Sequence, residues 1–348
     1  MSGPLEGITV VELGGIGPTP FCGMMLSDLG ASVTVIARAG RSQHPILDRG
    51  KTVVSANLKD EADAARVRAL IASADAVIEG FRPGVAERLG FGPEDVAGWN
   101  PAIVYGRITG FGRTGPLALR AGHDINYVAL SGALGVMGPK DGPPVPALNL
   151  VADFGGGGLL LALGVVSALL RSRVTGEGEV VDTAMVDGSA LLMSMIYGFH
   201  ALGRWSTERG TNLLDGGAPY YQTYECADGR HIAVGALEPE FFLTLVHGLG
   251  LREQVDVSRQ DDRRYWPELR DLLEHAFLTR PRDHWAALFA DVDACVTPVL
   301  AVDETAHHPH NAARATFTPI PGGMAPAPSP HFAPLPQTLT PILETSPR

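Results

Sequence analysis

Polar side chains are concentrated in the segment Gly122-His123-Asp124-Ile125-Asn126-Tyr127, which precedes the mostly apolar run 128–134. A histidine and a carboxylate stand side by side there, and adjacent residues do not face each other on a helix. We therefore expect different tasks for the two, with Asp124 as a helix N-cap and His123 at the mouth of that helix. Imidazole is the side chain most suited to exchanging protons near neutral pH, while the alternative is a structural histidine with satisfied hydrogen bonds.

A second acidic position, Asp153, precedes Phe154 and the four glycines 155–158, which lead into a long apolar run. Each glycine costs a helix about 1 kcal/mol relative to alanine, but it leaves bare backbone N–H groups at a positively polarised helix start. Such a start suits a developing oxyanion, held by the amides of 155–157, and a carboxylate beside it could be a base or a nucleophile. The alternative is that Asp153 only caps the helix. Glu238, which follows a predicted strand and precedes Pro239, has the same alternative.

Three arginines stand where an anionic ligand could bind. The turn Gly14-Gly15-Ile16-Gly17-Pro18-Thr19-Pro20 lacks the last glycine of a dinucleotide fingerprint, and no acidic residue follows the second predicted strand. Arg38 occupies that position and suits a ribose phosphate, as in coenzyme A or NADP. Arg82 and Arg88 follow a later strand, at the edge of the sheet where ligands bind. The alternative for all three is ordinary surface charge.

Composition excludes several classes of function. A formal net charge of −11 and the absence of a basic stripe argue against a nucleic-acid partner. Three widely separated cysteines, Cys22, Cys226 and Cys295, indicate neither a disulfide framework nor a zinc site, and we expect no metal and a reducing, cytoplasmic location. No targeting segment is visible, and the apolar run 155–170 falls just short of a membrane span, so we expect a buried core helix and no membrane partner.

Strands and helices alternate in the first half, which predicts an α/β fold with a doubly wound parallel sheet. A smaller α+β domain is expected to follow, built on a hairpin around Ala227-Asp228-Gly229. The predicted domains are 1–205, a large Rossmann-like domain; 206–305, the small domain; and 306–348, a C-terminal segment that returns to the large domain with a Pro-rich tail. Predicted strands are 8–13, 33–37, 51–56, 76–79, 103–107, 179–182, 220–225 and 231–235; predicted helices are 20–29, 60–73, 156–172, 184–202, 239–249, 266–278 and 282–290.

Many short motifs occur together in one order along the chain. Any one is weak, but the set is similar to the family III CoA-transferase superfamily, and most similar to its α-methylacyl-CoA racemase branch. The motifs are Pro4-Leu5-Glu6-Gly7, LSDLGA at 26–31, FRPGV at 81–85, TGFGRTGP at 109–116, GHDINY at 122–127, DFGGG at 153–157, GEG at 176–178, VVDTAMVDG at 180–188, LDGGAPYY at 214–221, YECADG at 224–229, GALEPEF at 235–241 and DACVTPV at 293–299. The loop 39–49 is shorter than in similar sequences, and the tail beyond Phe332 is longer.

The resemblance implies roles for the residues above. Transferases of the family use the aspartate at Asp153 as a nucleophile that forms a mixed anhydride, whereas racemases use it as a base and carry histidine at the position of His123. It also implies an interlocked homodimer in which Glu238 reaches His123 from the partner subunit. The implied CoA contacts are Arg38, Ala56, Asn57, Leu58, Lys59, Gly80, Phe81, Arg82, Arg88, Gly122, Asp124, Ile125, Asn126 and Tyr127.

The expected activity is epimerisation of 2-methylacyl-CoA thioesters at C2. Inversion needs two groups on opposite faces of the α-carbon, one to remove the proton and one to return it, and His123 and Asp153 come from different elements. No separate cofactor is expected, since coenzyme A is part of the substrate. Two alternatives stay open: a family III CoA-transferase with Asp153 as nucleophile, and a non-catalytic acyl-CoA binding protein on the same scaffold.

Overall fold

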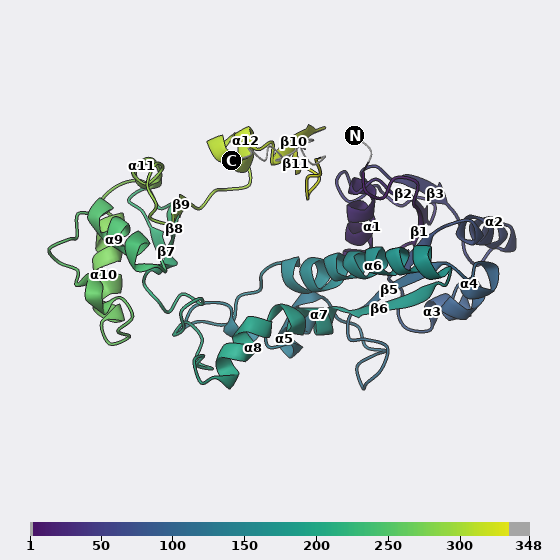
Figure 1. Cartoon of the computed structure of the whole chain (residues 1–348), viewed down its shortest axis with the longest axis horizontal. Helices are drawn as coiled ribbons and strands as arrows, with labels where there is room; N and C mark the ends of the chain where they lie inside the picture. Colours follow the sequence, from purple (N-terminus) through teal and green to yellow (C-terminus); the bar gives the residue numbers. More distant parts are fainter. Residues whose placement is uncertain (1–2, 334–348) are drawn as a thin grey trace, which may run out of the picture.

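A six-stranded parallel sheet organises the first half of the chain in the computed structural model, which describes residues 3–333 (Figure 1). The strand order is β3-β2-β1-β4-β5-β6. Strands β1 to β3 are added toward one edge and β4 to β6 toward the other, so the order reverses at the boundary between β1 and β4. The predicted doubly wound parallel sheet is therefore confirmed. The strands are β1 (Thr9–Leu13), β2 (Ser32–Ala37), β3 (Thr52–Ser55), β4 (Ala76–Glu79), β5 (Val104–Thr109) and β6 (Glu179–Ala184).

Helices cover both faces of the sheet because successive side chains on a strand point to opposite faces. Val10 of β1 belongs to a core with Leu26 and Leu161, while its neighbour Val11 belongs to a second core with Val67. The helices of this part are α1 (Pro18–Asp28), α2 (Glu61–Ala72), α3 (Val85–Arg88), α4 (Pro93–Trp99), α5 (Asp124–Leu130), the short η1 (Leu134–Val136), η2 (Leu150–Leu159), α6 (Leu160–Thr175), α7 (Met185–Leu192) and α8 (Ser194–Ala201).

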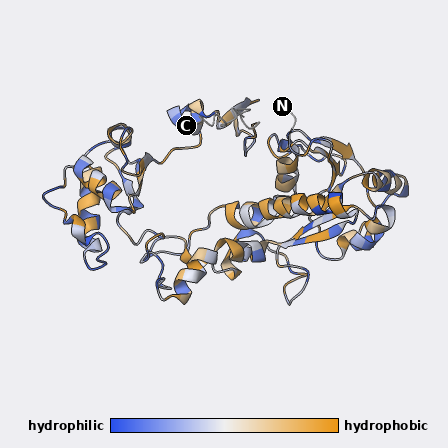
Figure 2. Ribbon diagram, viewed as in Figure 1, coloured by the Kyte–Doolittle hydropathy of each residue, from blue (hydrophilic) through white to orange (hydrophobic). Residues whose placement is uncertain are grey.

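The long apolar helix begins earlier than predicted. Its first part is the π-helix η2, in which Phe154 N donates to Asn149 O at 3.3 Å, and η2 runs directly into α6. Together they form the helix Leu150–Thr175, whose 26 residues and mean hydropathy of 1.8 would suffice to cross a membrane, so the prediction that it falls short is wrong. Leu161 and Val165 pack on Gly106 of the sheet, and Figure 2 shows α6 as predominantly hydrophobic.

The glycines of η2 allow close crossings with neighbouring helices. A Cβ on Gly156 would lie 2.6 Å from Ser189 N of α7, and one on Gly158 would lie 2.6 Å from Pro18 O of α1. From the other side, a Cβ on Gly188 would lie 1.8 Å from Gly156 O. The prediction that these glycines form a helix start is therefore wrong: they lie inside a helix whose amides bond to carbonyls five residues back, and their role is to let backbones approach. The predicted helix 184–202 is two helices, α7 and α8.

A second unit with its own core follows (Figure 1). Its antiparallel sheet packs Tyr224 against Phe277 with ring centroids 5.1 Å apart. The boundaries 1–205, 206–305 and 306–348 stay predictions. The elements are β7 (Tyr221–Glu225), β8 (His231–Gly235), β9 (Val296–Pro298), α9 (Pro239–Gly248), η3 (Val257–Arg259), α10 (Trp266–Phe277) and α11 (Arg282–Leu288).

The C-terminal segment carries η4 (Thr305–His307), α12 (Pro309–Ala313) and a hairpin of β10 (Phe317–Ile320) and β11 (Gly323–Pro326), which the Pro-rich composition did not predict. It contacts the large unit through Arg49, which pairs with Asp28 and whose Nη1 donates to Pro326 O at 2.5 Å. The return of residues 306–348 to the large domain stays a prediction. The tail beyond Phe332, noted above for its length, lies outside the described residues except for Ala333.

Candidate active site

The carboxyl ends of β1 and β4 flank the point where the strand order reverses, which is where open α/β sheets bind ligands. The turn after β1 passes through Gly17 with φ of 72°, a conformation that favours glycine. A Cβ added to Gly17 would lie 3.2 Å from Oδ2 of Asp153. The backbone of the turn between β1 and α1 therefore lies against the carboxylate of Asp153, which belongs to η2.

Asp124 joins the two predicted catalytic segments. Its carboxyl group is buried, and Oδ2 accepts the amides of Ala152 and Asp153, both at 2.8 Å. His123, the preceding residue, has the extended backbone of an N-cap and donates its N–H to Oδ1 of Asn126 at 3.0 Å. The prediction that Asp124 is the N-cap is therefore wrong, because His123 holds that position. Asp153 is also not an N-cap, since η2 begins three residues before it.

His123 is exposed to solvent at the mouth of α5. Burial raises the pKa of Asp153, and the Asp124 carboxylate raises it further. A hydrogen bond from Asn149 and the charge of His123 act in the opposite direction. A carboxyl group whose pKa lies above its ordinary value can hold and release a proton closer to neutral pH, as general acid–base catalysis requires.

Glu238 occupies the N-cap position of α9, as the capping alternative predicted, but its side chain makes no capping hydrogen bond. The residue is exposed. Within residues 3–333 of one chain, no hydrogen bond joins Glu238 to His123 or Asp153. A single chain therefore brings together two of the three predicted catalytic residues.

A cavity of about 460 Å³ lies at the carboxyl ends of β2 and β3. Arg38 lines it, whereas the predicted CoA-contact segment 56–59 follows directly after β3 and is not among its lining residues. Arg41, also in the wall, is held by Asp48, which accepts its Nη1 at 3.0 Å and Nη2 at 2.9 Å. Sequence analysis missed Arg41, although its place three residues after Arg38 was a usable signal. The lining residues are Ala37, Arg38, Ala39, Gly40, Arg41, Gln43, Val53 and Ser55.

The other predicted CoA contacts differ in accessibility. Arg82 and Arg88 are exposed near the end of β4, and so are Ile125 and Asn126 on α5. Asp124, another predicted CoA contact, is buried, and its carboxylate already accepts two backbone amides. Tyr127 is also buried, and its hydroxyl donates to Gly122 O at 2.5 Å.

A buried acid, Glu79, holds the loop after β4. It is 2% exposed, and Oε2 accepts the amide of Phe81 at 2.7 Å. Burial raises its pKa to about 7, while the Phe81 hydrogen bond opposes that rise. The loop 80–82, with the predicted contacts Gly80, Phe81 and Arg82, is thus fixed by a carboxyl group that titrates near neutral pH.

A buried ion pair supports α1. Lys51 Nζ lies 2.7 Å from Glu12 Oε2 and donates to Pro20 O at 2.8 Å, and both charged side chains are 0% exposed. The pair fixes the start of β3 and the first turn of α1 against β1, and α1 carries the glycine turn that faces Asp153.

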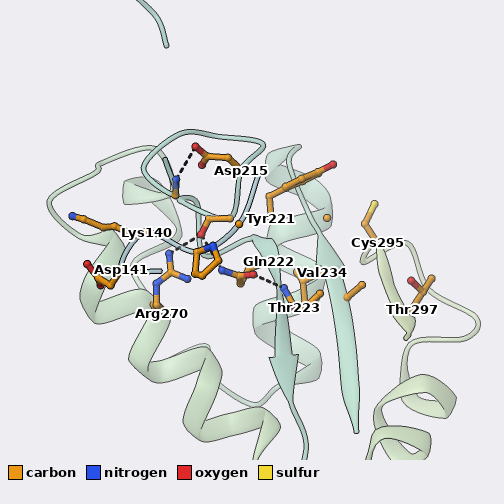
Figure 3. Close-up of a pocket in the computed structure, with 16 residues that line it drawn as sticks. Lys140, Asp141, Asp215, Tyr221, Gln222, Thr223, Val234, Arg270, Cys295 and Thr297 are labelled. Carbon is orange, nitrogen blue, oxygen red and sulfur yellow. Dashed lines mark hydrogen bonds between the residues drawn. The ribbon is translucent and has the colours of Figure 1, made fainter. Parts of the chain in front are cut away.

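A larger cavity, of about 940 Å³, lies away from the predicted catalytic residues (Figure 3). It lies over the face of the small sheet that carries Tyr221, Thr223 and Thr297, and segments near Lys140 and Asp215 close one side of it. Arg270 of α10 donates to Gly216 O and Gly217 O beside it. Because the predicted acid–base residues Asp153 and His123 lie at the sheet edge, that edge and not the larger cavity is the candidate active site.

The chain is 45% identical to α-methylacyl-CoA racemase of Mus musculus over 326 residues, or 94% of this chain and 85% of that protein. It is also 45% identical to the Homo sapiens racemase over 315 residues, or 90% and 82% of the two chains. A crystal structure of a CAIB/BAIF family protein from Brucella suis aligns with a TM-score of 0.82 at 27% identity, covering 96% of this chain and 93% of that one.

The resemblance read from the motifs, including its racemase branch, is therefore confirmed. Because a family model described as CoA-transferase family III matches residues 5–347, the chain belongs to that family.

Proposed function

We propose that this protein is an isomerase that epimerises 2-methylacyl-CoA thioesters at C2 by 1,1-proton transfer, with His123 and Asp153 as the two acid–base groups. Support comes from the 45% identity to racemases over most of the chain. The observation that carries the mechanism is the connection through Asp124, which ties the helix mouth holding His123 to the first turn of η2 holding Asp153.

In the proposed reaction, one group takes the proton from C2 and the C–H electron pair passes into the thioester to form an enolate. The other group then gives its own proton to C2 from the opposite face, and the enolate electrons form the new C–H bond. Each group thus ends in the protonation state in which the other began, so one turnover prepares the enzyme for the reverse direction. The raised pKa of Asp153 suits a carboxyl that must be base in one direction and acid in the other.

The test is proton exchange in D₂O with one enantiomer of a 2-methylacyl-CoA. We expect deuterium to enter C2 with loss of optical purity, and His123→Ala and Asp153→Ala to lower the exchange rate at least 100-fold, within the usual range for general acid–base groups of about 10² to 10⁴. Arg280→Ala, a substitution on the small unit, is the matched control with wild-type exchange. Unchanged exchange in both active-site variants would refute the proposal.

The transferase alternative predicts different results with the same acyl-CoA once hydroxylamine or a second carboxylic acid is added. Asp153 would then attack the thioester carbonyl, release CoA and form a mixed anhydride. Hydroxylamine would trap that anhydride as a hydroxamate on Asp153, and CoA would move to a second carboxylic acid. A non-catalytic binding protein would bind the acyl-CoA and give neither deuterium incorporation nor a hydroxamate.

We also propose an interlocked homodimer in which Glu238 completes the site of the partner chain. A single chain exposes many large apolar side chains on and around its long helix and on α7 and α8, more than a soluble monomer usually shows. They include Leu148, Leu150, Leu163, Leu170, Val174, Leu191, Leu192, Met195, Tyr197 and Leu202.

Mixed dimers test where Glu238 acts. His123→Ala and Glu238→Ala chains are each expected to be nearly inactive alone. If Glu238 crosses to the partner, co-expression gives mixed dimers with one complete site, and random assembly restores roughly a quarter of the wild-type activity. If Glu238 serves its own chain, the mixture stays inactive. Light scattering reports the oligomeric state directly.

For CoA, we propose that the 460 Å³ cavity with Arg38 takes the nucleotide end, with further contacts from 56–59, 80–82, Arg88 and the backbone of 122–127. Arg38→Ala is expected to raise KM for the CoA thioester about tenfold, the loss of one charge-assisted contact. It should leave the KM of an N-acetylcysteamine thioester, which lacks the nucleotide, unchanged. We propose no separate cofactor, metal or nucleic-acid partner, and a cytoplasmic location without a membrane partner.

A further inference from the structure

The carboxyl group of Asp124 lies beside Asp153 and accepts hydrogen bonds from the backbone. The residue is 5% exposed, and one oxygen, Oδ2, receives two consecutive backbone amides of the first turn of η2. These amides are among the first N–H groups of that helix, which have no partner within the helix itself. The group that satisfies them therefore comes from another helix, α5, and not from a local cap.

We propose that Asp124 is a positioning residue, whose carboxylate clamps the Ala152–Asp153 backbone and thereby fixes the Asp153 carboxylate relative to the His123 imidazole. The inference rests on the proposed function and reassigns Asp124 from the CoA contact implied by resemblance. A carboxylate accepting two amides gives charge-assisted hydrogen bonds, which are stronger and more directional than neutral ones. Because His123 directly precedes Asp124, one buried group sets the position of both acid–base residues.

The same carboxylate acts on Asp153 through its charge. The groups that face Asp153 are His123 and Asp124 from the start of α5, Tyr127 from its next turn and Asn149 before η2; Arg82 lies near Tyr127. On the α1 side the neighbour is the Gly17 backbone, and the first-turn acid of α7, Asp187, is exposed. Among the charged groups close to Asp153, Asp124 is the one whose negative charge raises its pKa.

Two substitutions separate the clamp from the charge. Asp124→Asn keeps an oxygen acceptor of the same size but removes the charge, whereas Asp124→Glu keeps the charge but displaces it by one methylene. Both are expected to lower kcat for C2 exchange by about 10- to 100-fold, with little change in KM. In Asp124→Asn the loss arises because uncharged hydrogen bonds hold the Asp153 backbone less firmly, and in Asp124→Glu because small misplacements of a catalytic group are costly. In Asp124→Asn the acid limb of the kcat/KM profile, in the direction where Asp153 is the base, should also move to lower pH. In Asp124→Glu that limb should stay in place.

Asp95→Asn is the matched control. Asp95 accepts the amide of Gly92 at 3.0 Å in the first turn of α4, away from the site, so its loss should leave kcat and the pH profile unchanged. A raised KM in Asp124→Asn with an unmoved acid limb would overturn the proposal and restore the CoA contact. An unmoved limb with wild-type kcat would reduce Asp124 to a structural residue.

A readout without turnover keeps this inference distinct from the proposed function. The Asp153 carboxyl can be titrated by NMR in protein labelled with ¹³C at the aspartate carboxyl, using Asp153→Asn to assign its signal. We expect Asp153 to titrate at lower pH in Asp124→Asn than in wild type. Absence of exchange in the wild-type enzyme refutes the proposed function alone, while an identical Asp153 titration in both proteins refutes the role of Asp124.

Discussion

Glu79 gives the sharpest test of the electrostatics of this fold. The ordinary glutamate pKa of 4.5 is raised to about 7 in the folded protein, because ionisation is opposed by burial. One pH unit corresponds to about 1.4 kcal/mol, so this gap amounts to about 3 kcal/mol. A folded-state pKa above the unfolded value means that the native state binds more protons between the two values. Glu79 therefore makes stability fall as pH rises from 4.5 to about 7, and adds no further slope above that pH.

The perturbation is Glu79→Gln, which keeps an oxygen to accept the amide of Phe81 but cannot ionise. We expect the free energy of unfolding of the variant, minus that of wild type, to increase by about 3 kcal/mol between pH 4.5 and about 7. Urea unfolding of the two proteins at matched pH values measures this difference. Glu87→Gln is a companion variant: the Glu87 charge helps to raise the pKa of Glu79, so its removal should move the fall in stability to lower pH.

A difference between Glu79→Gln and wild type that does not vary with pH would refute the reasoning. It would mean that Glu79 keeps its ordinary pKa of 4.5 in the folded protein, because the Phe81 hydrogen bond offsets the effect of burial. The loop 80–82 would then be held by a permanent carboxylate and not by a group that changes its charge near neutral pH.

Three further predictions concern other buried features. Asp153→Asn should abolish exchange yet raise the thermal midpoint at neutral pH, because the raised pKa of Asp153 means that folding disfavours its ionised form. This gain in thermal midpoint should vanish in melts below pH 3.8, the ordinary pKa of aspartate. Lys51→Met should lower the free energy of unfolding by about 3–5 kcal/mol in urea, because it leaves Glu12 buried and unpaired, and adding Glu12→Gln should recover much of the loss. Gly188→Ala should cost about 1–3 kcal/mol or more, because its Cβ would meet a helix backbone at 1.8 Å. In the same assay Gly98→Ala, with nothing within 4 Å of its Cβ, should stabilise α4 by up to about 1 kcal/mol.

The elements with a clear hydrophobic period were predictable from the sequence, and the positions set by tertiary partners were not. All strands of the parallel sheet were predicted to within two residues, because each is a short apolar run between turn residues. The start of η2 was missed, since apolar periodicity does not distinguish a π-helix from an α-helix and the four glycines resembled a start. Their function depends on Gly188 and Pro18, which lie far from them in sequence.

The site shows the same division. His123, Asp153 and Arg38 were identified from residue type and neighbours. The role of Asp124 was not, because an aspartate before an apolar run resembles an N-cap whether its oxygens accept local amides or those of a helix about 28 residues away. The Glu12–Lys51 pair spans 39 residues and leaves no local pattern at all.

The contact between Arg49 and Pro326 has a kinetic consequence. It joins residues 277 positions apart, so it closes the chain into a loop that contains nearly every other element. Synthesis delivers Pro326 after every strand of the parallel sheet, so the sheet can form before the loop closes. If two such chains interlock, neither can leave the other while both loops are closed. Subunit exchange would then require release of the C-terminal hairpin, and its rate would depend on that local opening and not on the affinity between the subunits.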